Sequence, residues 1–249
     1  MLKLFLHCIV LTTRIPLDRF IRFNEKSMMQ SLLFLPFVGA VLGILGVGFY
    51  LLISPFLPKE IVIIFVVTFL VLLTGAFEED ALADAVDGFG GGSNREKVLT
   101  IMRDSRIGAY GSLALILSIM MEFMFLLHTS PILLPKILFF AMVASRFSAL
   151  PLIWKMSYID DSSSFVSAFT KHARNTDGYK VLLLFFIVVL LGWILFGFAS
   201  FQIIGILLLI VIITGWYYYK RIQGVTGDCL GATLKISELV IIFFGVLWA

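Results

Sequence analysis

Five carboxylates crowd one short stretch of the chain, Glu78, Glu79, Asp80, Asp84 and Asp87, with no basic residue among them. Asp80, Asp84 and Asp87 are spaced i, i+4, i+7, so on a helix they project from one face. Like charges on one face destabilise an isolated helix. A Mg²⁺ ion would remove that repulsion, because carboxylates and substrate phosphates are its usual ligands. The spacing favours a metal site at these three aspartates, and a solvated acidic face is the alternative.

The residues between the aspartates are small or apolar, which indicates that this helix packs against a neighbour on at least one side: Ala81, Leu82, Ala83, Ala85 and Val86. Gly88 is expected to end the helix. The glycines at 90–92 would then let backbone N–H groups approach an anion, although a flexible turn explains them equally well.

Two further polar patches are candidates for substrate binding. Arg103 and Arg106 flank Asp104 just before an apolar run. Guanidinium groups in such a place could bind phosphate oxygens, or could serve as the ordinary basic anchor at the cytoplasmic end of a membrane helix. The stretch 224–232 carries Thr226 and Asp228, which are typical of a capped helix start.

The composition decides where these patches can lie. Of the 249 residues, 60% are hydrophobic and only 14% are charged, and the mean hydropathy is +1.05. Soluble domains carry about 25% charged residues. A soluble fold of this size could not hide so much apolar surface, so the excess must face lipid.

Windows of about 20 apolar residues, the length needed to cross a bilayer, predict an all-α integral membrane protein of about seven transmembrane helices. We expect the spans at 30–53, 60–77, 109–127, 133–153, 180–199, 202–219 and 232–248. The fifth and sixth should form a tight hairpin, and a re-entrant pair there would reduce the count to six. The apolar segment Leu4 to Thr12 is too short to span and reads as an interfacial or re-entrant helix. The whole chain, 1–249, is one polytopic domain.

The basic residues indicate the orientation. Sixteen of the 19 lysines and arginines fall before the first span or between spans two and three, four and five, and six and seven, whereas Lys59 and Lys136 lie on the other side. Cytoplasmic loops carry the excess of basic residues. The N-terminal segment 1–27 and an acidic, glycine-rich catalytic loop at 78–108 are therefore predicted to be cytoplasmic, in a bacterial or archaeal cytoplasmic (inner) membrane.

Ionisable residues inside spans are functional candidates by default. Arg146, about two turns from the cytoplasmic end of span four, lies within snorkelling reach of the interface. Glu238 in span seven is predicted to pair with Arg146 or Lys235, whereas Glu122 has no evident partner.

Taken in order, three motifs resemble the cobalamin synthase (adenosylcobinamide-GDP ribazoletransferase) family. They are the opening Leu11-Thr-Thr-Arg-Ile-Pro16, the acidic stretch followed by Met102-Arg-Asp-Ser-Arg-Ile-Gly-Ala-Tyr-Gly111, and Thr226-Gly-Asp-Cys-Leu-Gly-Ala232. The acidic motif of that family resembles Gly-Gly-Phe/Leu-His-x-Asp-Gly-Leu-Ala-Asp-x-x-Asp-Gly. Here Glu78 stands in the usual His place and Ala81 in the usual Gly place.

The resemblance implies a Mg²⁺-dependent transferase of vitamin B12 biosynthesis. The 3′-hydroxyl of α-ribazole, or of its 5′-phosphate, would attack the cobinamide-linked phosphorus of adenosylcobinamide-GDP and release GMP. By this resemblance Asp80, Asp84 and Asp87 hold the metal, and Glu78, Asp84 or Asp87 accepts the hydroxyl proton. The expected substrate-binding residues are Arg103, Asp104, Arg106 and Asp228.

Two rival functions follow from other features of the chain. CDP-alcohol phosphotransferases also place aspartates near the cytoplasmic interface, but their Asp-Gly-x-x-Ala-Arg pattern is missing here. A secondary transporter would place its site near the bilayer midplane in repeated halves, and no internal repeat is evident. We expect no nucleic-acid partner. The sequence leaves open whether the chain forms a homo-oligomer and which lower base is used.

Overall fold

The computed structural model of the chain describes residues 1–17, 30–159 and 178–249. These residues form helices and contain no strand, apart from one isolated bridge between Tyr158 and Val225. The all-α prediction is confirmed for this part of the chain. Five of the basic residues used to predict the orientation, Arg19, Arg22, Lys26, Lys171 and Arg174, lie outside the described residues.

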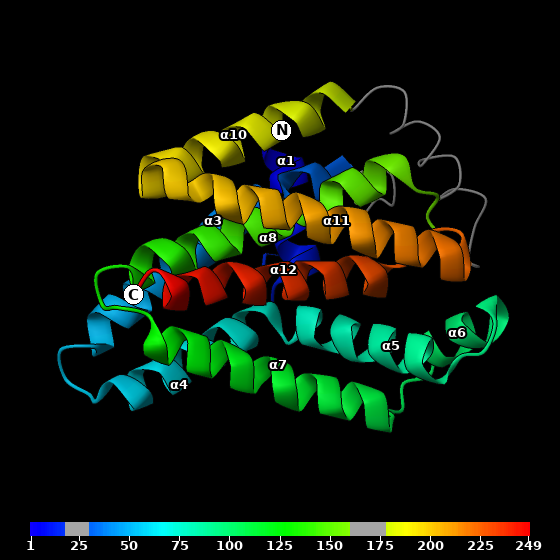
Figure 1. The fold of residues 1–249 in the computed structure, drawn as a ribbon, viewed down its shortest axis with the longest axis horizontal. Coiled ribbons are helices and arrows are strands. Elements are labelled where there is room, and N and C mark those ends of the chain that lie inside the picture. The colour runs from blue at the N-terminus through cyan, green and yellow to red at the C-terminus, as the bar shows by residue number, and fades with distance from the viewer. Residues whose placement is uncertain (18–29, 160–177) are drawn as a thin grey trace.

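In chain order the helices are α1 (Leu2–Thr12), α3 (Leu35–Ile53), α4 (Lys59–Thr74), α5 (Phe77–Gly91), α6 (Arg95–Met102), α7 (Ala109–His128), α8 (Leu134–Lys155), α10 (Gly178–Phe196), α11 (Ser200–Ile222) and α12 (Gly227–Leu247). The long helices α7, α8, α10, α11 and α12 run roughly along the long axis of the molecule (Figure 1). Helix α6, the end of α11 and the start of α12 lie at one end of the molecule. The C-terminus and the α3–α4 and α7–α8 connections lie at the other (Figure 1).

Five helical stretches of the described chain are long and apolar enough to cross a membrane, and a sixth is obtained if α4 and α5 count as one bent span. One of the five is the 45-residue stretch Gly178–Ile222. It contains the predicted fifth and sixth spans, and α10 and α11 pack against each other after the turn at Gly197, which has φ +59°. Large apolar side chains such as Phe186 and Ile212 are exposed on it, as a lipid-facing surface requires. The chain is an integral membrane protein, and the count of seven spans stays a prediction.

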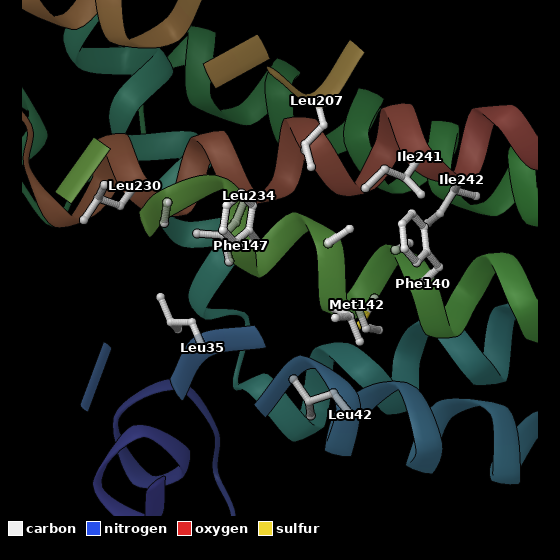
Figure 2. Close-up of a cluster of buried hydrophobic side chains, with 14 of the residues drawn as sticks. Leu35, Leu42, Phe140, Met142, Phe147, Leu207, Leu230, Leu234, Ile241 and Ile242 are labelled. Carbon is white, nitrogen blue, oxygen red and sulfur yellow. The ribbon is translucent and has the colours of Figure 1, made fainter. Parts of the chain in front are cut away.

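Helix α8 is the centre of the bundle and packs against both α3 and α12. Figure 2 shows Phe140 and Phe147 on its α12 side and Met142 on its α3 side. The contact with α3 is close because Gly39 has no side chain: a Cβ there would lie 2.2 Å from the Met142 carbonyl oxygen. Small residues allow this approach between membrane helices.

The predicted second span is different in the structure. The span ends at Thr74, and α4 meets α5 at an angle of 82°. Gly75 and Ala76 both adopt left-handed backbone conformations there, with φ +68° and +60°. The predicted helix over the acidic stretch is confirmed, because the small and apolar residues between the carboxylates let α5 pack against α7 and α12. The acidic stretch is therefore held on a rigid helix.

Candidate active site

Helix α5 presents its carboxylates on two different faces. Asp80 is exposed and Asp84 half-buried, whereas Glu78 and Glu79 are buried toward the bundle. Ala81, Leu82 and Ala85 are buried as well, so α5 is anchored by its apolar residues. The side chains of Asp80 and Asp84 make no hydrogen bond or ion pair to any part of the chain that the structure describes. We call the face of α5 that carries Asp80 and Asp84 the open acidic face.

Helix α12 brings a further carboxylate to this face. Asp228 lies in the first turn of α12, where Thr226 is the N-cap and accepts a hydrogen bond from the Cys229 backbone N–H at 3.2 Å. The predicted capped helix start is confirmed. Asp228 lies within electrostatic range of Asp80, Asp84 and Arg103. The fold thus gathers three aspartates and one arginine that are far apart in the sequence.

Asp87 has a different environment from the other two predicted metal ligands. Its carboxylate accepts hydrogen bonds from the backbone N–H groups of Gly108 at 2.6 Å and Gly111 at 2.9 Å. These are the first free N–H groups of α7, where negative charge is favourable. Asp87 therefore fixes the start of α7 against α5, and its part in catalysis or metal binding stays a prediction.

This contact predicts the effect of a methyl group at Gly111. A Cβ at that position would lie 2.3 Å from Asp87 Oδ2 and 2.9 Å from the Ala83 carbonyl oxygen. We expect Gly111→Ala to push α7 away from α5 and to lower the free energy of unfolding by about 1–3 kcal/mol, the usual cost of leaving a buried polar group without its partner. Thermal unfolding in detergent measures the loss. The matched control is Gly205→Ala, where a Cβ meets nothing within 4 Å, and equal melting of both variants would contradict the prediction.

Two residues of the predicted phosphate-binding patch form an ion pair with each other. Arg106 donates to Asp104 through Nε and Nη2, the latter at 2.6 Å, and its side chain is 87% exposed. Hydrogen bonds from Arg106 lower the pKa of the Asp104 carboxyl to about 2. Arg103, by contrast, lies in the electrostatic field of Asp228. The structure therefore brings Arg103 near Asp228, whereas Arg106 and Asp104 pair with each other.

Glu78 is not brought together with the aspartates. Its carboxylate pairs with Arg146, which is 2% exposed and also bonds Glu238. Arg146 therefore does not extend toward the membrane surface as the sequence suggested, because two carboxylates hold it inside the bundle. The role of Glu78 as a proton acceptor stays a prediction that these contacts do not favour.

A buried ionic network extends from this pair, and the sequence showed only part of it. Lys235, placed among the cytoplasmic basic residues by the sequence, is 2% exposed and pairs with Glu79, Glu122 and Glu238. The predicted pairing of Glu238 with Arg146 or Lys235 is confirmed, since it pairs with both. One signal for the inward direction of Glu78 was available, because Glu78, Leu82 and Ala85 share one helical face.

The glycines after the acidic stretch also act differently from the prediction. Helix α5 continues through Gly88 to Gly91. A Cβ at Gly88 would lie 2.5 Å from Met102 Cγ, so this glycine admits α6 rather than ending α5. The end of α5 is capped from α11, where Arg221 donates to the carbonyl oxygens of Phe89 at 3.1 Å and Gly92 at 2.7 Å.

The carboxylates of the open acidic face suit a Mg²⁺ ion that is also bound by waters and substrate phosphates. No group of three or more His, Cys, Asp or Glu side chains in the described ranges is arranged to hold a metal by itself. Mg²⁺ is usually bound through one or two carboxylates, several waters and substrate phosphates. Asp80 and Asp84, which have no other bonding partner among the described residues, provide that smaller set.

Known proteins resemble this chain over nearly its whole length. The family model for cobalamin-5-phosphate synthase matches residues 4–246. A protein of Shewanella piezotolerans named adenosylcobinamide-GDP ribazoletransferase is 35% identical over 242 residues, 96% of this chain and 93% of that protein. Proteins of the same name from Vibrio parahaemolyticus and Shewanella baltica are 32% and 33% identical, covering 96% and 97% of this chain and 90% and 93% of theirs. No solved structure matches.

These relatives match the chain nearly end to end, including the stretches that form α5, α6 and the start of α12. Both the family model and the relatives agree with the family that the sequence motifs indicated. The chain belongs to the cobalamin-5-phosphate synthase family, whose members are transferases of cobalamin biosynthesis.

Proposed function

We propose that the protein is an adenosylcobinamide-GDP ribazoletransferase. It joins adenosylcobinamide-GDP to α-ribazole or α-ribazole 5′-phosphate, gives adenosylcobalamin or its 5′-phosphate, and releases GMP. The observation that carries the proposal is the open acidic face of α5, with Asp228 of α12 beside it, in a chain that matches this family over residues 4–246. Such a face suits a transfer from a diphosphate to a hydroxyl, where positioning and charge stabilisation provide most of the catalysis.

In the proposed reaction the 3′-oxygen of the ribazole forms a bond to the phosphorus that carries cobinamide. The bond from that phosphorus to the bridging oxygen of GMP breaks, and GMP leaves with the bond electrons. Asp84 or Asp228, both half-buried at the open acidic face, accepts the proton of the hydroxyl. Glu78 is not assigned this role because Arg146 binds its carboxylate inside the bundle.

Asp80 and Asp84 would hold Mg²⁺, which when bound supplies neutralisation of the charge that develops on the phosphate oxygens. Arg103 lies near Asp228 and binds a phosphate oxygen of the substrate. Asp87 positions the start of α7 through Gly108 and Gly111. The Arg106–Asp104 pair shapes the connection between α6 and α7.

We also propose that the open acidic face lies on the cytoplasmic side of a bacterial inner membrane, with the N-terminus on the same side. The excess of lysine and arginine in the predicted cytoplasmic segments supports this orientation.

The proposal is tested with detergent-purified protein, adenosylcobinamide-GDP and α-ribazole 5′-phosphate. We expect GMP and a cobamide 5′-phosphate in equal amounts, identified by chromatography and mass spectrometry. Incorporation of a lipid alcohol from a CDP donor would point instead to a CDP-alcohol phosphotransferase. Uptake of either substrate into proteoliposomes without chemical change would point to a transporter.

A further inference from the structure

A polar cavity of about 470 Å³ lies where the end of α1 meets the α4–α5 bend. Its lining includes Thr13, Arg14, Thr74, Gly75 and Asp80. Asp80 belongs to the open acidic face, so this cavity adjoins the proposed metal site. In this cavity the residues that follow α1 lie beside the start of α5.

The backbone of Arg14 is fixed across the bend. Its N–H donates to the Leu73 carbonyl oxygen at 2.7 Å, close to the end of α4. The preceding residue is held as well, since Thr13 Oγ1 donates to the Ile9 carbonyl oxygen at 2.6 Å and accepts from the Ile15 N–H. The base of the Arg14 side chain is therefore anchored on two elements.

The bend is also shaped to admit this side chain. Gly75 has φ +68°, a backbone conformation that favours glycine. A Cβ at Gly75 would lie 2.3 Å from Arg14 Nε and 2.7 Å from its Cγ. A single glycine thus permits both the turn from α4 to α5 and the passage of the arginine over it.

The guanidinium of Arg14 is exposed and makes no ion pair or hydrogen bond to any described residue, although Asp80 lines the same cavity. The backbone of Arg14 is therefore fixed while its guanidinium group has no partner among the described residues. The positive charge is available to a ligand. Guanidinium groups bind phosphate oxygens through two parallel hydrogen bonds, which a lysine cannot reproduce.

We propose that Arg14 binds a phosphate group of the substrate in this cavity, opposite the carboxylate of Asp80. The inference rests on the proposed function. Two phosphate groups have the required chemistry: the diphosphate of adenosylcobinamide-GDP and the 5′-phosphate of the ribazole. The two sources differ in which kinetic constant depends on Arg14.

The test compares wild type, Arg14→Gln and Arg14→Lys in steady-state assays with free α-ribazole and with α-ribazole 5′-phosphate. If Arg14 binds the donor diphosphate, Arg14→Gln raises the KM for adenosylcobinamide-GDP roughly ten- to hundredfold with either acceptor, the range for a hydrogen bond to a charged group. If it binds the acceptor phosphate, only the KM for α-ribazole 5′-phosphate rises by that factor. Arg14→Lys should recover part of the loss in either case.

The matched control is Arg95→Gln, an exposed arginine at the start of α6, which should leave all KM values unchanged. Thermal unfolding of each variant identifies a folding defect, and Arg14→Lys decides the question should Arg14→Gln fail to fold. Wild-type KM values in both Arg14 variants would overturn this inference while leaving the proposed function intact. Absence of turnover in the wild type would instead overturn the proposed function, and this inference with it.

Discussion

Asp84→Asn should lower the rate of cobamide formation by at least about a hundredfold at limiting Mg²⁺. Losing even a group that orients a metal ligand costs about 10- to 100-fold, and the proposed role of Asp84 is a direct ligand. The amide keeps the size of the side chain but loses its charge. Because Asp84 lies near Asp80, Asp87 and Asp228, removing one negative charge relieves repulsion, so the folded protein should not be destabilised.

The measurement is the initial rate as a function of Mg²⁺ concentration for wild type, Asp84→Asn and Glu96→Gln. Glu96 is an exposed carboxylate in the first turn of α6 and serves as the matched control. High Mg²⁺ should restore part of the activity of Asp84→Asn and leave Glu96→Gln at the wild-type level. Full activity of Asp84→Asn at limiting Mg²⁺ would remove Asp84 from the metal site.

Arg146→Met should be the most destabilising substitution in the core. Arg146 pairs with Glu78 and Glu238, and all three side chains are at most 6% exposed. Removing one member of a buried ion pair leaves an uncompensated charge, which costs about 3–5 kcal/mol. Glu238 keeps Lys235 as a partner, so the loss falls mainly on Glu78.

Thermal unfolding in detergent tests this expectation, with a fall in melting temperature on the order of 10 °C. The double variant Arg146→Met with Glu78→Gln should melt above Arg146→Met alone, because the unpaired carboxylate is gone. Arg95→Met, on the surface of α6, is the control for loss of an arginine. If Arg146→Met had the same melting temperature as the wild type, this network would not be what holds α5 to α8.

The sequence predicted the membrane helices well, because an apolar run long enough to cross a bilayer can satisfy its backbone hydrogen bonds in lipid as a helix. The start of α12 at Thr226 and the shared face of Asp80 and Asp84 also followed from local rules of capping and periodicity. The bend at Gly75 did not, since apolar residues lie on both sides of it and a glycine in such a run signals packing as often as a turn. The aspartate spacing predicted the acidic helix itself, but not its sharp angle to α4.

The buried network was the other feature that local rules could not predict. Lys235 and Glu122 are 113 positions apart, and only the packing of α12 against α7 brings them together. Among the five neighbouring carboxylates, the face that Glu78 shares with Leu82 and Ala85 indicated an inward direction but not a partner. What separates Glu78 from Asp80 is which face of α5 meets Arg146 on α8, and that depends on the assembled bundle.

The proposed reaction is tested most directly by the metal dependence of the transfer. Purified protein is given adenosylcobinamide-GDP and α-ribazole 5′-phosphate with Mg²⁺, with EDTA, and with Mg²⁺ restored in excess over EDTA. We expect equal amounts of GMP and cobamide 5′-phosphate with Mg²⁺, neither product with EDTA, and recovery of both products when the metal is restored. Undiminished turnover in EDTA, or no transfer by folded protein in any condition, would contradict the proposed reaction.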